Sequence, residues 1–174
     1  MVDQQRTDIG YVSGRLCALV EYLHEACKNE YGRVSNVALV CQHPFAMMQQ
    51  FVAVVHCYKK NPEFEPLLLE LVGKLSTDGD VLPKHLNIKE QGDFMIAYTM
   101  QKGELKTYRL QLGNKIAALR GLKGMSQREL AEKANITQAN INNIENGRYS
   151  VGIDILFRIS SALDCDMQEL VNTK

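Results

Sequence analysis

Apolar residues recur along most of the chain at the three- and four-residue spacing that is typical of amphipathic α-helices. Short polar or proline-containing segments separate these stretches. In the first hundred residues we predict helices over 8–28, from Pro44 to Val55, from Pro66 to Leu75 and over 88–101, with a further turn near 34–40. Several amphipathic helices with short links favour an antiparallel bundle of four to five helices.

The pattern changes after Gly103, where the polar segment 104–111 begins. We place a domain boundary there, so that residues 1–103 form the bundle and residues 104–174 form a second helical domain. The joint is too short to act as a long flexible tether. The sequence therefore predicts an all-α protein of two domains.

Within the bundle, small and charged residues lead to two further expectations. Gly14 and Ala18 would let another helix approach the first one closely. The basic residues, Arg15 among them, are dispersed along the chain, and we expect them on a solvated surface rather than in one groove. On this interpretation, the bundle has no basic patch of its own.

Two short helices joined by a tight turn are predicted in the second domain. The first carries a narrow stripe of small and apolar residues that a second helix can cross closely. Thr137 supplies a hydroxyl that can cap the second helix, and Ile141 and Ile144 face its core. Gly147 ends that helix, because glycine tolerates the left-handed conformation of a C-cap.

The other face of the second helix is polar, with the residues Gln138, Ala139, Asn140, Asn142 and Asn143. Amide side chains donate and accept hydrogen bonds together, so they can bind adenine in a bidentate way and can also reach phosphates. This arrangement is typical of a helix that enters the major groove of DNA. The same face is also compatible with a simple solvated surface, and some helix-turn-helix modules bind only protein.

Residues 112–171 resemble the Cro/C1-type (xenobiotic-response-element) helix-turn-helix family. The segment 116–124 is similar to the first helix of the family, and the apolar residues of 155–170 match its last two helices. The resemblance implies a five-helix, lambda-repressor-like domain. It also implies that Arg120 and Glu145 form an ion bridge between the first and third helices.

The polar face and the resemblance together assign DNA binding to residues in and around the two helices, namely Gln127, Thr137, Gln138, Ala139, Asn140, Asn142, Asn143 and Arg148. By resemblance, Gln127 holds a phosphate, Asn140 and Arg148 contact the DNA backbone, and Gln138 and Asn143 face bases. Ala139 also faces bases, where it would make an apolar contact such as one with a thymine methyl.

The charge of this domain argues against strong binding by one copy. Residues 109–174 hold nine Lys or Arg and seven Asp or Glu, an excess of two. Phosphate neutralisation supplies much of the affinity of DNA-binding proteins, so a monomer this neutral should bind poorly. We therefore expect a homodimer on double-stranded DNA that reads two half-sites about one helical turn apart.

Three segments of the first domain resemble one family in their order and spacing: 14–21, His43-Pro-Phe45 and 86–98. They are similar to the C-terminal helical region of the large subunit of type I-C CRISPR surveillance complexes, which is itself similar to the small subunit. The likeness covers about residues 10–102 and implies type I-C subunits as partners. The 174 residues do not include the part that recognises the protospacer-adjacent motif. They also depart from the family at 98–101, where it often places more aromatic and His residues.

Composition narrows the classes of function. No apolar run approaches the ~20 residues of a membrane span and no signal core follows the first residues, so we expect a cytoplasmic protein without membrane contacts. Five cysteines fit a reducing compartment. The sets Cys41 with His43 and His56 with Cys57 have the wrong spacing for a structural zinc site. We expect no metal, no cofactor and no enzymatic activity, since no histidine is paired with a nucleophilic residue at a sequence spacing that is typical of a catalytic site.

Two functional hypotheses remain. The preferred one is a sequence-specific DNA-binding transcriptional regulator, whose first domain supplies dimerisation or a protein partner, and which controls cas expression or inhibits type I-C interference by subunit mimicry. The rival is an assembly component of a type I-C surveillance complex, whose C-terminal module binds nucleic acid without sequence preference.

Overall fold

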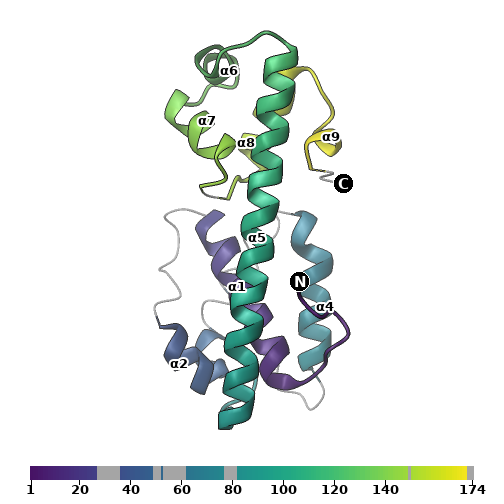
Figure 1. The fold of residues 1–174 in the computed structure, drawn as a ribbon, viewed down its shortest axis with the longest axis vertical. Helices are drawn as coiled ribbons and strands as arrows, with labels where there is room; N and C mark the ends of the chain where they lie inside the picture. The colour runs from purple at the N-terminus through teal and green to yellow at the C-terminus, as the bar shows by residue number, and fades with distance from the viewer. Residues whose placement is uncertain (27–35, 49–51, 53–61, 77–81, 149, 172–174) are drawn as a thin grey trace. The chain divides into compact units, whose positions relative to one another are not determined.

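The computed structural model describes residues 1–26, 36–48, 52, 62–76, 82–148 and 150–171. Every regular element in this part of the chain is helical, which confirms the all-α class (Figure 1). Contacts divide the chain into two compact units, 1–105 and 106–174. None of the described helices is both long and apolar enough to cross a bilayer.

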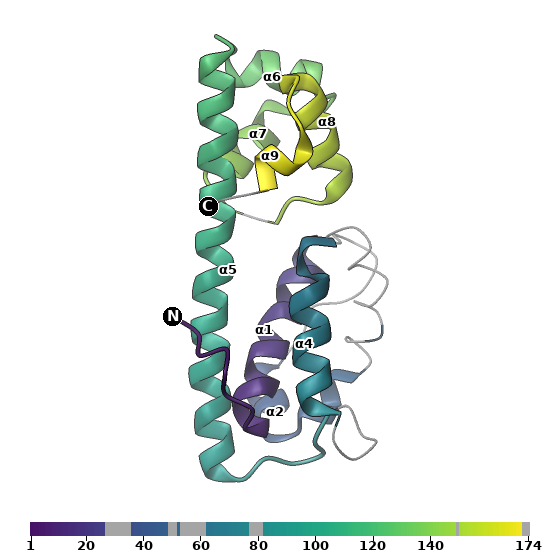
Figure 2. The same ribbon diagram turned by 90° about the vertical axis from the view of Figure 1, so that its right-hand side faces the viewer.

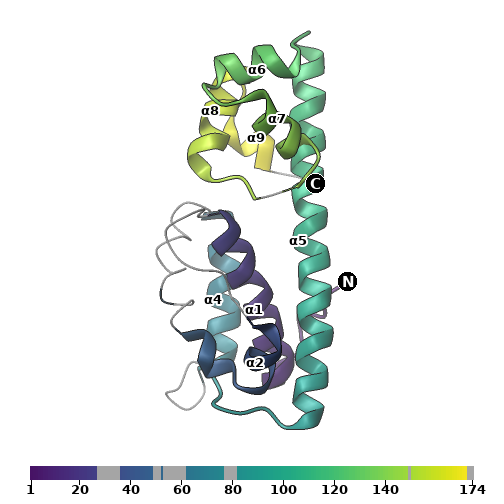
Figure 3. The same cartoon turned by 90° about the vertical axis from the view of Figure 1, so that its left-hand side faces the viewer.

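The first unit is formed by helices of unequal length. They are α1 (Ile9–Ala26), α2 (Val37–Gln42), the 3-10 turns η1 (Pro44–Met47) and η3 (Pro62–Phe64), α4 (Glu65–Leu75) and the first part of α5 (Ile88–Leu122). α1 lies between α4 and α5 (Figures 2 and 3). Of the helix predicted from Pro44 to Val55, only the start and Val52 lie within the described residues.

Helix α1 is buried on all sides rather than along one stripe. The predicted stripe of Val12, Leu16, Leu19, Val20 and Leu23 is fully buried, and Tyr11, Cys17 and Ala18 on other faces are buried as well. A helix that is buried on every side along its length occupies the centre of a protein. α1 is therefore the central helix of the first unit; Cys27, predicted for the same stripe, lies outside the described residues.

Two glycines bring α1 against the backbone of α5. A Cβ atom built on Gly14 would lie 2.2 Å from the carbonyl oxygen of Phe94, and one on Gly10 would lie 2.2 Å from that of Glu90. The close approach predicted at Gly14 is thus confirmed. Because the contacts advance together along both helices, α1 and α5 run parallel.

The predicted antiparallel order therefore holds for only one neighbour of α1. The rings of Tyr22 and Phe64 are in contact, while Arg15 reaches Glu70, so α1 and α4 run in opposite directions. The parallel pairing of α1 with α5 is possible because more than sixty residues, including α2 and α4, separate the two helices in the chain. Sequence spacing alone did not reveal this.

Arg15 contradicts the expectation of a solvated side chain, because it is only 1% exposed. Its Nε donates a 3.0 Å hydrogen bond to Oε1 of Gln101, and its Nη1 lies 3.5 Å from Oε1 of Glu70. A buried charge is tolerated when it is paired and hydrogen-bonded. Arg15 thus connects α1 to both of its neighbours.

Helix α5 corrects the predicted end near residue 101 and the polar joint after Gly103. It continues without a break to Leu122 and includes the segment that we assigned to a separate first helix of the C-terminal domain. The segment 104–111 is rich in Glu, Leu, Lys, Arg and Gln, which are good helix formers. Its polarity reflects partial exposure, not a break. The division between the two units falls inside this helix, after Leu105.

The second unit packs the end of α5 with α6 (Gln127–Lys133), α7 (Gln138–Glu145), α8 (Ile153–Leu163) and α9 (Met167–Val171). Its core is a single apolar cluster that includes Leu112, Ile116, Leu130, Ile141, Ile144, Leu156, Ile159, Leu163 and Leu170. All five helices contribute to this cluster. The core holds α6 and α7 at the surface as a pair.

Candidate nucleic-acid interface

The start of α6 is fixed by a reciprocal cap. Ser126 Oγ accepts a 3.2 Å hydrogen bond from the backbone N–H of Glu129, and Glu129 Oε2 accepts a 2.7 Å bond from the N–H of Ser126. This capping box satisfies two backbone donors that a helix start leaves open. The bonds to Ser126 lower the pKa of Glu129. The Ser-x-x-Glu signal was present in the sequence, although we did not use it.

The turn and α7 follow the predicted local structure. Asn135 adopts a left-handed conformation with a φ of 52° at the turn. Thr137 then caps α7, with its Oγ1 accepting a 3.1 Å hydrogen bond from the N–H of Asn140. Gly147, with a φ of 60°, ends the helix region as expected. Local sequence signals therefore set both ends of α7.

One face of α7 is anchored in the core. Ile141 and Ile144 are buried, and a Cβ atom on Gly113 of α5 would lie 2.3 Å from the carbonyl oxygen of Ile144. This spacing leaves no room for a side chain between the two helices. The orientation of α7 about its own axis is fixed as a result.

The opposite face of α7 carries the polar residues predicted to contact DNA. At about 100° per residue, Ala139, Asn142 and Asn143 point away from the buried isoleucines, and Gln138 and Asn140 lie at the two sides. Thr137, Gln138, Ala139 and Arg148 are exposed, whereas Asn140, Asn142 and Asn143 are half-buried. Figure 3 shows α7 with the adjoining α6 in the second unit. These side chains are grouped as a base-reading surface requires.

Asn143 is partly engaged within the chain. Its Oδ1 accepts a 3.3 Å hydrogen bond from Nη1 of Arg148, and its backbone carbonyl accepts one from the Arg148 N–H at 2.9 Å. A bidentate contact with adenine needs both the oxygen and the amino group of an amide. Because the amide oxygen has two lone pairs, Asn143 can make that contact with its second lone pair and its amino group while Arg148 stays bound.

Beneath α7, Glu145 is the centre of a polar network. Its side chain is 6% exposed, and its two oxygens accept hydrogen bonds from Nε and Nη2 of Arg120 at 2.7 and 3.1 Å. This hydrogen bonding raises the pKa of Arg120. Arg120 also donates to the carbonyl of Met125 at 2.8 Å, just before α6. The ion bridge implied by the family resemblance is formed, and it joins α5, α7 and the start of α6.

Gln127 belongs to the same network, which the sequence reasoning missed. Its Nε2 donates a 2.7 Å hydrogen bond to Oε2 of Glu145. An amide nitrogen has two hydrogens, so one remains for an outside acceptor such as a phosphate. A contact between residues 18 positions apart leaves no periodic signal in the sequence.

The charges around the two helices partly cancel. Arg128 and Glu132, both exposed, form an ion pair at 2.9 Å on the surface of α6. Lys123 lies 3.7 Å from Asp164 at the C-terminal end of α8. Each pair reduces the positive potential that DNA phosphates would meet. The excess of two basic residues in 109–174 is therefore not concentrated at Arg128 and Lys123.

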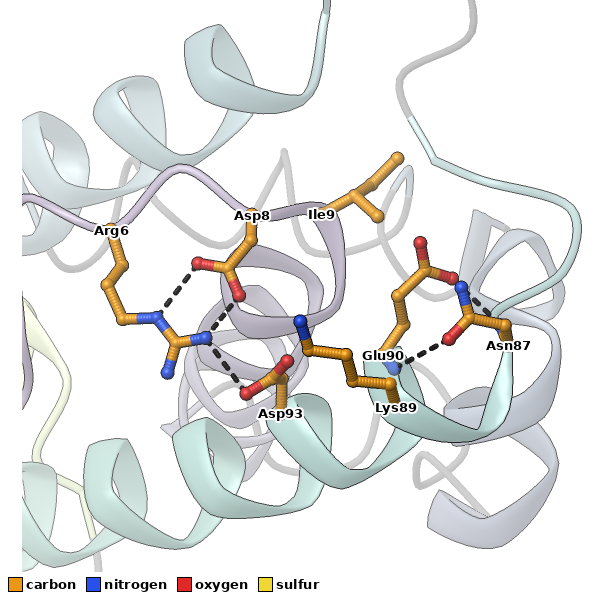
Figure 4. Close-up of a pocket in the computed structure, with 7 residues that line it drawn as sticks. All are labelled: Arg6, Asp8, Ile9, Asn87, Lys89, Glu90 and Asp93. Atoms are coloured by element: carbon orange, nitrogen blue, oxygen red, sulfur yellow. Dashed lines mark hydrogen bonds and ion pairs between the residues drawn. The ribbon is translucent and has the colours of Figure 1, made fainter.

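A pocket in the first unit has a different chemical character (Figure 4). Arg6 pairs with Asp8 and lies 2.8 Å from Asp93, while Asn87 and Glu90 cap each other at the start of α5. Among the lining residues, three carboxylates face two cations, Arg6 and Lys89. A site with this balance does not favour phosphate groups, so this pocket is not part of the candidate nucleic-acid interface.

Comparison with known families agrees with the geometry of both units. A helix-turn-helix family model (HTH_3) matches residues 116–170, which contain the end of α5 and α6 to α9. The model of the family CRISPR-associated protein (Cas_Csd1) matches residues 1–106, more than half of the chain. The chain belongs to this CRISPR-associated family. Neither a search of curated proteins nor one of solved structures gave a match.

These matches confirm both resemblances stated from the sequence. The Cas_Csd1 match ends close to the division between the two units, and the helix-turn-helix match begins inside α5. The chain therefore combines a CRISPR-associated helical unit with a helix-turn-helix unit.

Proposed function

We propose that this chain is a sequence-specific transcriptional regulator that binds double-stranded DNA as a homodimer. The observation that carries the proposal is the outward face of α7, where Ala139 is exposed opposite the buried Ile141 and Ile144 and Gln138 is exposed beside it. Amides on such a face can pair with base edges in a major groove, and an alanine can contact a thymine methyl. The helix-turn-helix match supports the same function.

The homodimer follows from the charge of the second unit. With Arg128 and Lys123 each close to a carboxylate, one copy offers few cations to phosphates. Two copies double the phosphate contacts and the base contacts on one duplex. Sedimentation of the free protein and of its DNA complex should therefore give two chains per duplex. A complex with one chain per duplex would contradict this part of the proposal.

The first unit connects the proposed regulator to CRISPR systems. Membership of a CRISPR-associated family supports a link to CRISPR systems, and we propose that the unit acts as a small-subunit-like partner or dimerisation domain of the type I-C kind. A chain of this design would repress cas genes, or would inhibit type I-C interference by taking the place of a genuine subunit. The two roles are compatible in one protein, because they use different units.

The family match also favours a rival function. Since it covers the larger part of the chain, the protein could instead be an assembly component of a type I-C complex, with a C-terminal unit that holds nucleic acid without sequence preference. In either role the chain binds its partners and catalyses no reaction.

A gel-shift titration with the DNA upstream of the protein's own gene separates the two functions. For a regulator, we expect a saturable complex that survives an excess of unrelated duplex. The double variant Gln138→Ala with Asn143→Ala should bind more weakly, since each lost base contact costs about 1–3 kcal/mol, or about 5- to 150-fold in Kd. Equal binding of the parent protein to every duplex would support the rival.

Gln111→Ala provides a matched control for this experiment. Gln111 is an exposed amide on α5, away from α7 in the sequence and in the same unit. Its replacement removes an amide without touching the proposed reading face, so the Kd should stay at the parent value. A loss of binding equal to that of the double variant would show that the assay reports general polarity and not base contacts.

Co-purification with tagged type I-C subunits tests the CRISPR part of the proposal. Recovery of the full-length chain with those subunits, but not with an unrelated tagged protein, is the expected result. Absence of the chain from the purified complex at micromolar concentrations would refute subunit mimicry, while leaving the DNA-binding function intact.

A further inference from the structure

Two histidines from distant parts of the first unit meet at a junction of loops. His43 lies between α2 and η1, and His85 lies in the segment that precedes α5. Their Nδ1 atoms are 2.8 Å apart, and the ring planes make an angle of 78°. His43 is half-buried and His85 is exposed. The pair is therefore held by the fold on one side and open to solvent on the other.

The backbones on both sides of the pair are tied together. Phe45 donates its N–H to the carbonyl of Pro83, and Leu86 donates its N–H to the carbonyl of Gln42, each at 3.0 Å. The N–H of His43 is also bound, to the carbonyl of Leu39 at 2.8 Å. These bonds fix the Cα positions of both histidines, so that only rotation of the side chains is free.

Two neutral imidazoles in this geometry share one proton between their Nδ1 atoms. The same two nitrogens are a bidentate donor set when that proton moves to Nε2 of its own ring, which leaves both imidazoles neutral. We propose that His43 and His85 form a binding site for a late divalent transition metal ion of the Cu²⁺ or Ni²⁺ class, in which the ion takes the place of the hydrogen bond between the rings. This inference is independent of DNA binding.

The spacing of the nitrogens places both within reach of one ion. Two imidazole ligands at about 2.0 Å from a metal lie about 2.8 Å apart when they are cis in a square plane and about 3.3 Å apart in a tetrahedron. The 2.8 Å of the hydrogen bond lies close to both values, and the higher affinity of nitrogen donor sites for Cu²⁺ and Ni²⁺ than for earlier divalent ions favours these two metals. Each ring must turn by about 45° to aim its lone pair at the ion, and rotation about χ2 of His is soft.

Other ligands would come from one carbonyl and from water. The carbonyl oxygen of Lys84 is 3.3 Å from Nδ1 of His43, and the exposure of His85 admits water. Within the described residues, no group of three or more His, Cys, Asp or Glu side chains is placed to hold a metal. The site is thus a two-histidine chelate. It differs from the Cys41–His43 and His56–Cys57 sets that we considered and rejected from the sequence.

Calorimetric titration of the full chain with Ni²⁺, at neutral pH and with the thiols kept reduced, tests the site. We expect one ion per chain, and a Kd at least about tenfold higher for His85→Gln and His43→Gln. His24→Gln, which removes a histidine of α1, is the control and should keep the parent Kd. Because His85 is exposed, thermal melting of His85→Gln without metal should match the parent, so that weaker binding would not reflect unfolding.

A second measurement reads the ligands directly. With one equivalent of Cu²⁺, the electron paramagnetic resonance spectrum should show a tetragonal centre with two equatorial nitrogens in the parent, and one in His85→Gln. Equal Ni²⁺ affinity for the parent and both site variants would overturn the proposal. So would a spectrum of the parent that His85→Gln leaves unchanged, or a parent chain that takes up no metal.

Discussion

Removal of Arg120 should destabilise the second unit far more than removal of a surface arginine. Arg120 is 19% exposed at the side chain and makes three hydrogen bonds, two of them to Glu145, which is 6% exposed. In Arg120→Ala, the Glu145 carboxylate keeps only its bond from Gln127. Breaking a buried pair from one side costs about 3–5 kcal/mol. Because Arg120 is partly solvated, we expect the free energy of unfolding of the second unit to fall by about 3 kcal/mol, the lower end of this range.

Arg128→Ala is the matched control, since Arg128 also binds a glutamate through Nε, at 2.9 Å. Both partners of that pair are largely exposed, with 78% and 64% of their side-chain surface accessible. An exposed pair of this kind contributes little to stability. The two variants therefore differ in the burial of the pair and in the number of hydrogen bonds that the arginine makes.

Hydrogen exchange of the α7 amides is the suitable assay, because the chain has two units and no tryptophan to report on one of them. The free energy of opening should fall by about 3 kcal/mol in Arg120→Ala and should stay close to the parent value in Arg128→Ala. Adding Glu145→Ala to Arg120→Ala should cost less than the sum of the single changes. Equal protection in the two arginine variants would refute the reasoning.

Three further predictions concern other parts of the chain. Gln127→Ala should weaken DNA binding by a similar factor on every sequence, since phosphates carry no base identity; a changed sequence preference in gel shifts would contradict the phosphate role. Gly14→Ala should lower the melting temperature of the first unit, because its Cβ would overlap the Phe94 carbonyl and overpacking costs at least about 1–3 kcal/mol. Gly92→Ala, with open space around it, should not lower it. The bond from Arg6 lowers the pKa of Asp8 below 3.8. Its contribution is therefore complete above pH 3.8 and is lost as pH falls through the lowered value. Asp8→Asn should therefore melt at a lower temperature than the parent near neutral pH, and thermal melting in acid should show this difference shrinking as pH falls through the lowered value.

Local features of the fold could be predicted from the sequence. Three of them are the apolar stripe of α1, the cap by Thr137 and the end of α7 at Gly147. Each depends on residues within one or two helical turns of each other, so it can be recognised without the tertiary structure. The continuous helix α5 was missed because polarity at 104–111 was interpreted as a break, although helix propensity there is high. A polar segment therefore does not by itself indicate a break where helix propensity remains high.

Long-range contacts could not be predicted in this way. Arg15 is buried because Gln101 and Glu70, 86 and 55 positions away, meet its guanidinium. The outward face of α7 followed from periodicity, whereas the bond from Gln127 to Glu145 depends on how α6 crosses α7. The resemblance to known families supplied the Arg120–Glu145 pair, which periodicity alone would not have given.

Redesign of this chain for a new target sequence is constrained by Glu145. That one carboxylate receives hydrogen bonds from the residue that begins α6 and from the arginine that secures α5. A library that varies Gln138, Ala139, Asn142 and Asn143 leaves both attachments in place. A library that extends to position 145 would contain variants that do not bind DNA because the second unit is unfolded. These would be mistaken for variants that fold but do not recognise the target sequence.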